Sequence, residues 1–243
     1  MIKKPSVPNR TSESGVARQS TSGEIDAFLS KAAGLQPASS DGAGRLIFAL
    51  DATMSRQPTW DSACVLQADM FREALGIGGL AVQLVYFRGM GECRAGKWVS
   101  DGDALASLMS RIDCRGGHTQ IRKVLAHALK ETGRQPVRAL IYVGDCMEED
   151  VDLLCARAGE LGLKGVKAFM FQEGFEPSAE RAFREIARLT SGAYCRFDAG
   201  AADQLRRLLK AVAAYAAGGF KALEAKGGSE PRLLLEQMKG NGR

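Results

Sequence analysis

Three oxygen-bearing side chains follow a short apolar run near the start of the chain. Asp51, Thr53 and Ser55 occupy alternate positions in the stretch RLIFALDATMS, directly after the apolar residues 46–50. A run of five apolar residues without a polar face predicts a central strand that is covered on both sides. In open parallel sheets, ligands bind where such strands end. The three side chains are therefore candidate ligands for a hard cation.

A second carboxylate follows a similar run further along the chain. Residues 139–143 are again continuously apolar, and the run ends at a glycine and Asp145. We expect this carboxylate at the same edge of the sheet as Asp51. Four further acidic residues follow: Glu148, Glu149, Asp150 and Asp152. We expect them at the start of the next helix, where the positive end of the helix dipole favours negative charge, rather than in a second metal site.

A third hydroxyl, that of Thr119, lies between these two regions. It follows the pair Gly116 and Gly117, which allows a tight loop, and it precedes a segment, residues 121–129, with the apolar spacing of a helix. A threonine at this place could instead be a simple helix N-cap, and that alternative stays open. Mg²⁺ prefers about six oxygen ligands, whereas zinc favours Cys and His. Two carboxylates and the two hydroxyls that follow Asp51 therefore favour Mg²⁺, or Mn²⁺, over zinc.

Alternating strands and helices must position these side chains. The apolar periodicity predicts strands over residues 46–50, 80–89, 93–100, 139–143, 166–174 and 193–197, and helices over residues 59–76, 101–112, 121–129, 178–192 and 201–219. No crossover helix separates the second strand from the third, so we expect the third to be an antiparallel edge strand. The alternation predicts a mainly parallel α/β sheet with helices on both faces.

Composition indicates one globular domain with flanking segments. The chain has 243 residues, of which 45% are hydrophobic and 25% are charged. We expect a disordered or linker segment with a short amphipathic helix over residues 1–43, the domain over 44–218 and a tail over 219–243, in which PRLLLEQM could dock as a helix. No run is long enough to span a membrane, and the N-terminus lacks the apolar core of a secretion signal.

Charge and cysteine usage narrow the function classes. The net charge of +5 is spread along the chain without a basic stripe, so a nucleic-acid partner is not expected. The six cysteines are far apart in sequence and lack a C-x-x-C pair, which favours free thiols in a reducing cytoplasm over disulfides.

The motifs together resemble the von Willebrand factor A (vWA) domain family. The resemblance rests on D-x-T-x-S after the first strand, G-G-x-T before a middle helix and G-D after the fourth strand, and it extends over roughly residues 45–217 to the pattern FREIARLTSGAYCRFDAGAADQLRRLL. It implies a Rossmann-like vWA fold with a metal-ion-dependent adhesion site (MIDAS) formed by Asp51, Thr53, Ser55, Thr119 and Asp145. The chain departs from the family pattern at Thr53, where serine is usual, at Met54, where a small residue is usual, and at His118.

Three functions follow from these observations. The resemblance implies a binding module, not an enzyme, that captures an acidic side chain of a protein partner through the cation. A second possibility is a metal-independent scaffold or RNA-associated protein with a vestigial site. A third is a phosphatase with Asp51 as nucleophile, but Thr53 stands where such enzymes need a second acid. Other catalytic motifs are absent from the sequence, and His127 is expected on the solvent side of its helix.

Overall fold

The computed structural model describes residues 44–58, 60, 71–72, 75, 79–197 and 202–240. The expected N-terminal segment with its amphipathic helix, and most of the helix expected over residues 59–76, lie outside these ranges. Three described residues of that helix, Trp60, Phe71 and Leu75, are buried in the core. The Phe71 ring packs edge-to-face on Phe48, with ring centroids 4.7 Å apart.

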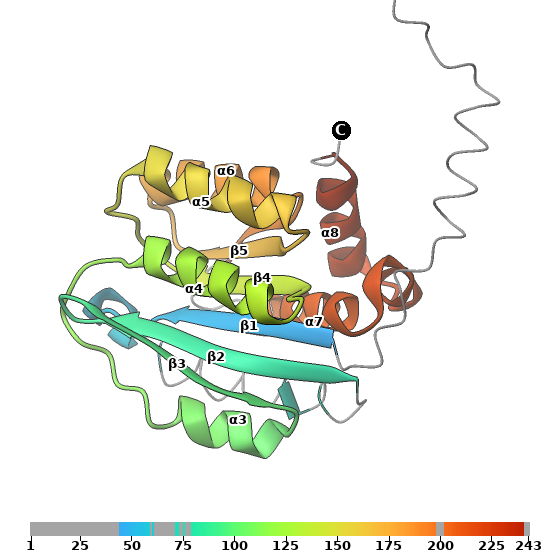
Figure 1. The fold of residues 1–243 in the computed structure, drawn as a ribbon, viewed down its shortest axis with the longest axis horizontal. Helices are drawn as coiled ribbons and strands as arrows, with labels where there is room; N and C mark the ends of the chain where they lie inside the picture. The colour runs from blue at the N-terminus through green and yellow to red at the C-terminus, as the bar shows by residue number, and fades with distance from the viewer. Residues whose placement is uncertain are drawn as a thin grey trace, which may run out of the picture. The chain divides into compact units, whose positions relative to one another are not determined.

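The core of the fold is a six-stranded sheet (Figure 1). Its strands are β1 (Gly44–Asp51), β2 (Leu80–Arg88), β3 (Glu92–Val99), β4 (Ala139–Gly144), β5 (Lys167–Glu173) and β6 (Ala193–Phe197), in the order β3-β2-β1-β4-β5-β6. All neighbouring pairs are parallel except β2 and β3, which are antiparallel. The predicted mixed sheet with one antiparallel edge strand is confirmed.

Helices cover both faces of this sheet (Figure 1). On one face lie α4 (Ile121–Arg134), α5 (Val151–Leu163) and α6 (Pro177–Leu189), and on the other α3 (Gly102–Met109), α7 (Ala202–Ala225) and α8 (Ser229–Gly240). Side chains of β1 alternate between the two cores: Leu46, Phe48 and Leu50 face one, and Ile47 and Ala49 face the other. This double burial is why the first strand has no polar face.

The end of α6 differs from the sequence expectation. The helix was expected to extend to Gly192, but it ends at Leu189. Thr190 caps it, and Ser191 turns the chain with a left-handed φ of 50°. The glycine is required for another reason, because a Cβ at position 192 would collide with the backbone carbonyl of Ala168 in β5. Gly192 therefore allows β6 to approach the sheet rather than ending the helix.

The C-terminal part of the chain contributes to the core. Helix α7 continues past the expected end at residue 219 to Ala225, with a kink at Gly219, whose φ is 70°. Helix α8 follows, and its Leu234 and Met238 are buried in the same cluster as Leu223 of α7. Over the described ranges, no helix is both long and apolar enough to cross a membrane. The five described cysteines are free thiols.

Candidate metal centre

Asp51 and Asp145 meet because β1 and β4 are neighbouring parallel strands. Leu50 pairs with Val143 in the register of these strands, so Asp51 is level with the last residue of β4 and Asp145 follows one position later. Asp51 is completely buried, and Asp145 is half-buried. The two carboxylates interact electrostatically, although they are 94 positions apart in sequence.

The loop after β1 holds the first two hydroxyls beside Asp51. The Thr53 amide donates to Asp51 Oδ1 at 2.8 Å, and the Thr53 and Ser55 hydroxyl oxygens are 3.1 Å apart. Thr53 is buried, whereas Ser55 is exposed at the mouth of the site. The Ala52 amide donates to Phe87 O at the end of β2, which anchors the loop to the sheet.

Thr119 is held by a reciprocal pair of hydrogen bonds to the loop that carries Asp145. The Glu148 amide donates to Thr119 Oγ1 at 3.0 Å, and the Thr119 amide donates to Glu148 Oε2 at 3.0 Å. The adjacent Gly117 packs against Gly89 of the β2–β3 turn so closely that a Cβ would collide with its backbone. Gly117 therefore allows the loop before α4 to approach the β2–β3 turn closely, whereas a Cβ at Gly116 would meet nothing. Glu148 connects the loop before α4 to the loop after β4.

The structure does not use Thr119 as the N-cap of α4. The N-cap is Gln120, whose side chain makes no capping bond. Instead, the carboxylate of Glu149 accepts hydrogen bonds from the Ile121 and Arg122 amides, the second at 3.1 Å. The simple capping alternative for Thr119 is therefore wrong, because a neighbouring loop satisfies the free amides at the start of the helix.

The acidic residues Glu148, Glu149, Asp150 and Asp152 therefore act at the starts of two different helices. Glu148 and Glu149 were expected at the start of the next helix, α5, but they bind backbone amides at and before the start of α4. Asp150 is the N-cap of α5 and accepts a hydrogen bond from Leu153, while Asp152 lies in its first turn, where the helix dipole favours it. Sequence spacing alone could not distinguish these roles, because α4 starts about 28 residues earlier in the chain.

Both aspartates leave one buried oxygen unsatisfied. Asp51 Oδ2 and Asp145 Oδ1 are buried and have no hydrogen-bond partner among the described residues. Burial raises the pKa of Asp51 to about 6, and the charge of Asp145 adds to this effect, whereas hydrogen bonds from Thr53 and the charge of Arg56 oppose it. An unsatisfied buried carboxylate oxygen is costly unless a cation, a proton or water meets it. The donor set therefore fits a hard divalent cation.

Two charged residues at this edge, Arg56 and Glu173, were not predicted from the sequence. Arg56 is only 1% exposed, and its guanidinium forms an ion pair with the carboxylate of Glu173 at the end of β5. The signal for Glu173 was present, since a carboxylate ends a third buried strand, here one residue after the apolar run rather than directly after it as in β1. No comparable signal existed for Arg56, because an arginine in a polar loop is normally solvated.

The hydroxyls remain essential to any metal site here. In the part of the chain that the structure describes, no group of three or more His, Cys, Asp or Glu side chains is placed to hold a metal ion. Glu173 is directed to Arg56 instead. Two carboxylates alone do not fill the coordination sphere of Mg²⁺, so neutral oxygens and water would have to supply the rest.

His127 was expected on the solvent side of its helix, but it is less exposed than that. It is half-buried, and its Nε2 lies 2.8 Å from Gln83 Oε1 in β2. Burial lowers its pKa. The side chain therefore packs α4 on the sheet.

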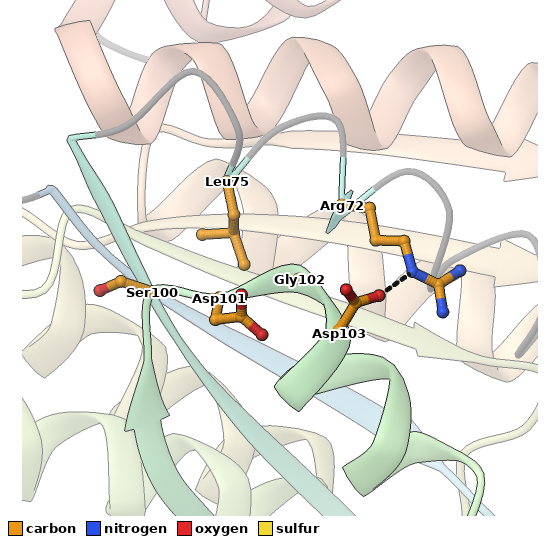
Figure 2. A pocket seen from close by; sticks show the side chains of 6 residues that line it. All are labelled: Arg72, Leu75, Ser100, Asp101, Gly102 and Asp103. Carbon is orange, nitrogen blue, oxygen red and sulfur yellow. Dashed lines mark hydrogen bonds and ion pairs between the residues drawn. The ribbon is translucent and has the colours of Figure 1, made fainter.

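A hollow elsewhere on the domain has a structural explanation. It measures ≈ 210 Å³ and is lined by Arg72, Leu75, Ser100, Asp101, Gly102 and Asp103 (Figure 2). The Arg72 guanidinium pairs with Asp103 at 2.6 Å, and Asp101 caps α3 by accepting a hydrogen bond from Ala104. The charged side chains that line this hollow therefore have structural roles: Arg72 and Asp103 pair with each other, and Asp101 caps α3.

Comparisons with solved structures identify the fold. An aerotolerance-related membrane protein from Bacteroides fragilis is 17% identical, with a TM-score of 0.50 over 68% of this chain and 99% of that chain. The VWA domain of SpRpn10 is 13% identical, with a TM-score of 0.50 over 64% of this chain and 88% of that one. The pilus adhesin SpaC from Lactobacillus rhamnosus GG is 10% identical, with a TM-score of 0.56 over 71% of this chain and 30% of that one.

The chain therefore has the fold of a vWA domain, as the sequence motifs predicted. At these identities the likeness establishes the fold alone. The sequence matches no protein-family model, and it has no match among curated proteins.

Proposed function

We propose that this chain is a metal-dependent protein-binding module. Asp51, Thr53, Ser55, Thr119 and Asp145 would hold Mg²⁺ or Mn²⁺ at the strand edge. The cation would supply a Lewis acid that attracts an Asp or Glu carboxylate of a partner protein. The observation that carries this proposal is the pair of buried, unpartnered oxygens on Asp51 and Asp145.

Apolar side chains near the same strand ends support a protein partner. Met54, three residues after Asp51, is 53% exposed, and Phe175, two residues after β5, is 66% exposed. Leu153, in the first turn of α5, is 49% exposed. Exposed apolar side chains around a polar centre are typical of protein interfaces. A nucleic-acid partner would favour a basic surface, and the charges of this chain are dispersed.

The same geometry disfavours a phosphatase. Asp51 is completely buried, and its Oδ1 accepts a hydrogen bond from the Thr53 amide, so the carboxylate is poorly placed for nucleophilic attack. Thr53 also lacks the acidic group that such a mechanism needs two residues after the nucleophile.

A metal-independent scaffold is the second candidate, and Arg56 favours it. This buried guanidinium lies within electrostatic range of Asp145 and Asp51, so it already offsets part of their negative charge. Because the guanidinium already neutralises part of the carboxylate charge, the folded protein depends less on a bound divalent ion. The two candidates differ in whether metal binds at all.

Calorimetric titration with Mn²⁺ and Mg²⁺ separates these candidates. The wild-type chain should bind one ion, and Asp145→Asn should abolish binding. Asp103→Asn is the matched control, because Asp103 is 80% exposed in α3 and pairs with Arg72 away from the site. Pull-downs with and without EDTA should then show partners that need both metal and Asp145. If the wild type binds neither ion, the scaffold replaces the metal-dependent module.

A further inference from the structure

Three carboxylates end three consecutive strands of the sheet. Asp51 ends β1, Asp145 follows β4, and Glu173 ends β5. Gly144 pairs with Gln172 in the register of β4 and β5, so Glu173 is level with Asp145. Parallel strands thus place Glu173 at the same edge as the two aspartates.

Arg56 lies among these carboxylates. It follows Ser55 directly, and it is one of the largest fully buried side chains of the described structure. Its guanidinium is paired with Glu173. The negative charges of Asp145 and Asp51 also act on it. An arginine cannot shed its charge by deprotonation in a protein, so its positive charge is permanent.

The formal charges at this edge have a simple balance. Asp51, Asp145, Glu173 and Arg56 together carry two net negative charges when all are ionised, apart from the Glu148 carboxylate that accepts a hydrogen bond from the Thr119 amide. Burial raises the pKa of Tyr142, which is buried within electrostatic range of Arg56 and the two aspartates, well above the ordinary value, so this side chain stays neutral. Two negative charges match one divalent cation.

We propose that the Arg56–Glu173 ion pair sets the metal affinity of the candidate centre. Glu173 holds the guanidinium on the β5 side and compensates its charge. Without Glu173, the guanidinium would be drawn to Asp51 and Asp145 and would compete with the metal for them. The proposal rests on the function proposed above, since it assigns to Arg56 and Glu173 the tuning of that same site.

Four proteins test this proposal by Mn²⁺ titration calorimetry: the wild type, Glu173→Gln, Arg56→Met and the double variant Arg56→Met/Glu173→Gln. The first substitution should weaken Mn²⁺ binding at least about tenfold, because the site loses one negative charge and gains a competing cation. Arg56→Met should tighten binding by a similar factor. The double variant restores two net negative charges and should bind within about threefold of the wild type.

Glu131→Gln is the matched control for a purely structural role. Glu131 pairs with Arg45 at 3.0 Å in another buried ion pair, and Arg45 lies near the start of β1, at the end opposite Asp51. This variant should lower the melting temperature yet leave the Mn²⁺ affinity unchanged. If the variants that carry Arg56→Met do not fold, the comparison of Glu173→Gln with Glu131→Gln still tests the proposal, because only Glu173→Gln should weaken Mn²⁺ binding.

Two results would overturn the inference. One is a Glu173→Gln protein that binds Mn²⁺ as tightly as the wild type. The other is a double variant as weak as Glu173→Gln, which would assign the loss to packing rather than to charge. Either result would leave the proposed metal centre standing, whereas a wild-type chain that binds no Mn²⁺ would refute both.

Discussion

Asp51 and Asp145 end neighbouring parallel strands, and each keeps one buried carboxylate oxygen without a hydrogen-bond partner in the described structure. Their mutual repulsion and desolvation oppose folding when both are ionised. Anything that neutralises them only in the folded state must therefore stabilise the domain.

A bound divalent cation should raise the melting temperature. At a concentration about one hundred times the dissociation constant, Mg²⁺ or Mn²⁺ should stabilise the folded state by about 2.7 kcal/mol. In a chain of this size, that corresponds to a rise of roughly 5–10 °C. Thermal melts in EDTA and in millimolar metal measure the shift. Superimposable curves would contradict the metal centre, and Asp145→Asn should remove the shift from an otherwise responsive protein.

The contribution of Asp51 to the stability of the metal-free protein should fall as the pH rises from about 4 to about 7. Burial raises the pKa of Asp51 from 3.8 to about 6 in the folded state, so the folded protein binds more protons than the unfolded protein within this window. The stabilisation is complete below pH 4 and is lost as the pH passes 6, by about 3 kcal/mol in total. Urea unfolding in EDTA at several pH values measures it.

Asp51→Asn should flatten this pH dependence, because the variant has no proton to exchange at that position. The comparison separates Asp51 from other titrating groups, which remain in both proteins. If the free energy of unfolding of Asp51→Asn falls with pH as steeply as that of the wild type, another group is responsible for the pH dependence.

Thr119→Ala should abolish metal-dependent partner capture while the fold survives. The change removes one of three hydroxyl oxygens and leaves the Glu148 amide without its acceptor, at a cost of about 1–2 kcal/mol. Thr119→Ser keeps the hydroxyl and should retain capture. Pull-downs with and without EDTA compare the two variants. Metal-dependent partners that remain on Thr119→Ala would count against Thr119 as a ligand.

Phe71→Ala should destabilise the fold and leave metal binding intact, which is the opposite of the effect expected for Thr119→Ala. Phe71 is completely buried against Phe48 in the core opposite α4. Its truncation should cost about 3–5 kcal/mol through cavity formation. Metal affinity, measured below the lowered melting temperature, should stay within about twofold of the wild type, since Phe71 contributes no metal ligand. A parallel loss of metal affinity would show that the site depends on general core packing.

Local pattern was sufficient for most of the fold. The central strands β1 and β4 contain short continuous apolar runs, and α3, α4 and α6 follow helical spacing, so both kinds of element were predictable. The boundaries were less secure: α6 stops before Gly192, and α7 continues through Gly219. Whether a helix ends at either glycine depends on tertiary packing and backbone conformation, and the spacing of apolar residues in the sequence contains neither.

The strand-end carboxylates Asp51 and Asp145 were also determined by the sequence, because a polar residue that ends a buried parallel strand must emerge at one edge. Only the tertiary structure decided which groups meet them. Glu148 binds Thr119 across 29 residues, and Arg56 is buried against Glu173 across 117 residues. Such partners are set by strand order and by loops that converge in space. The candidate ligands could therefore be identified from spacing, whereas the charge balance around them required the folded chain.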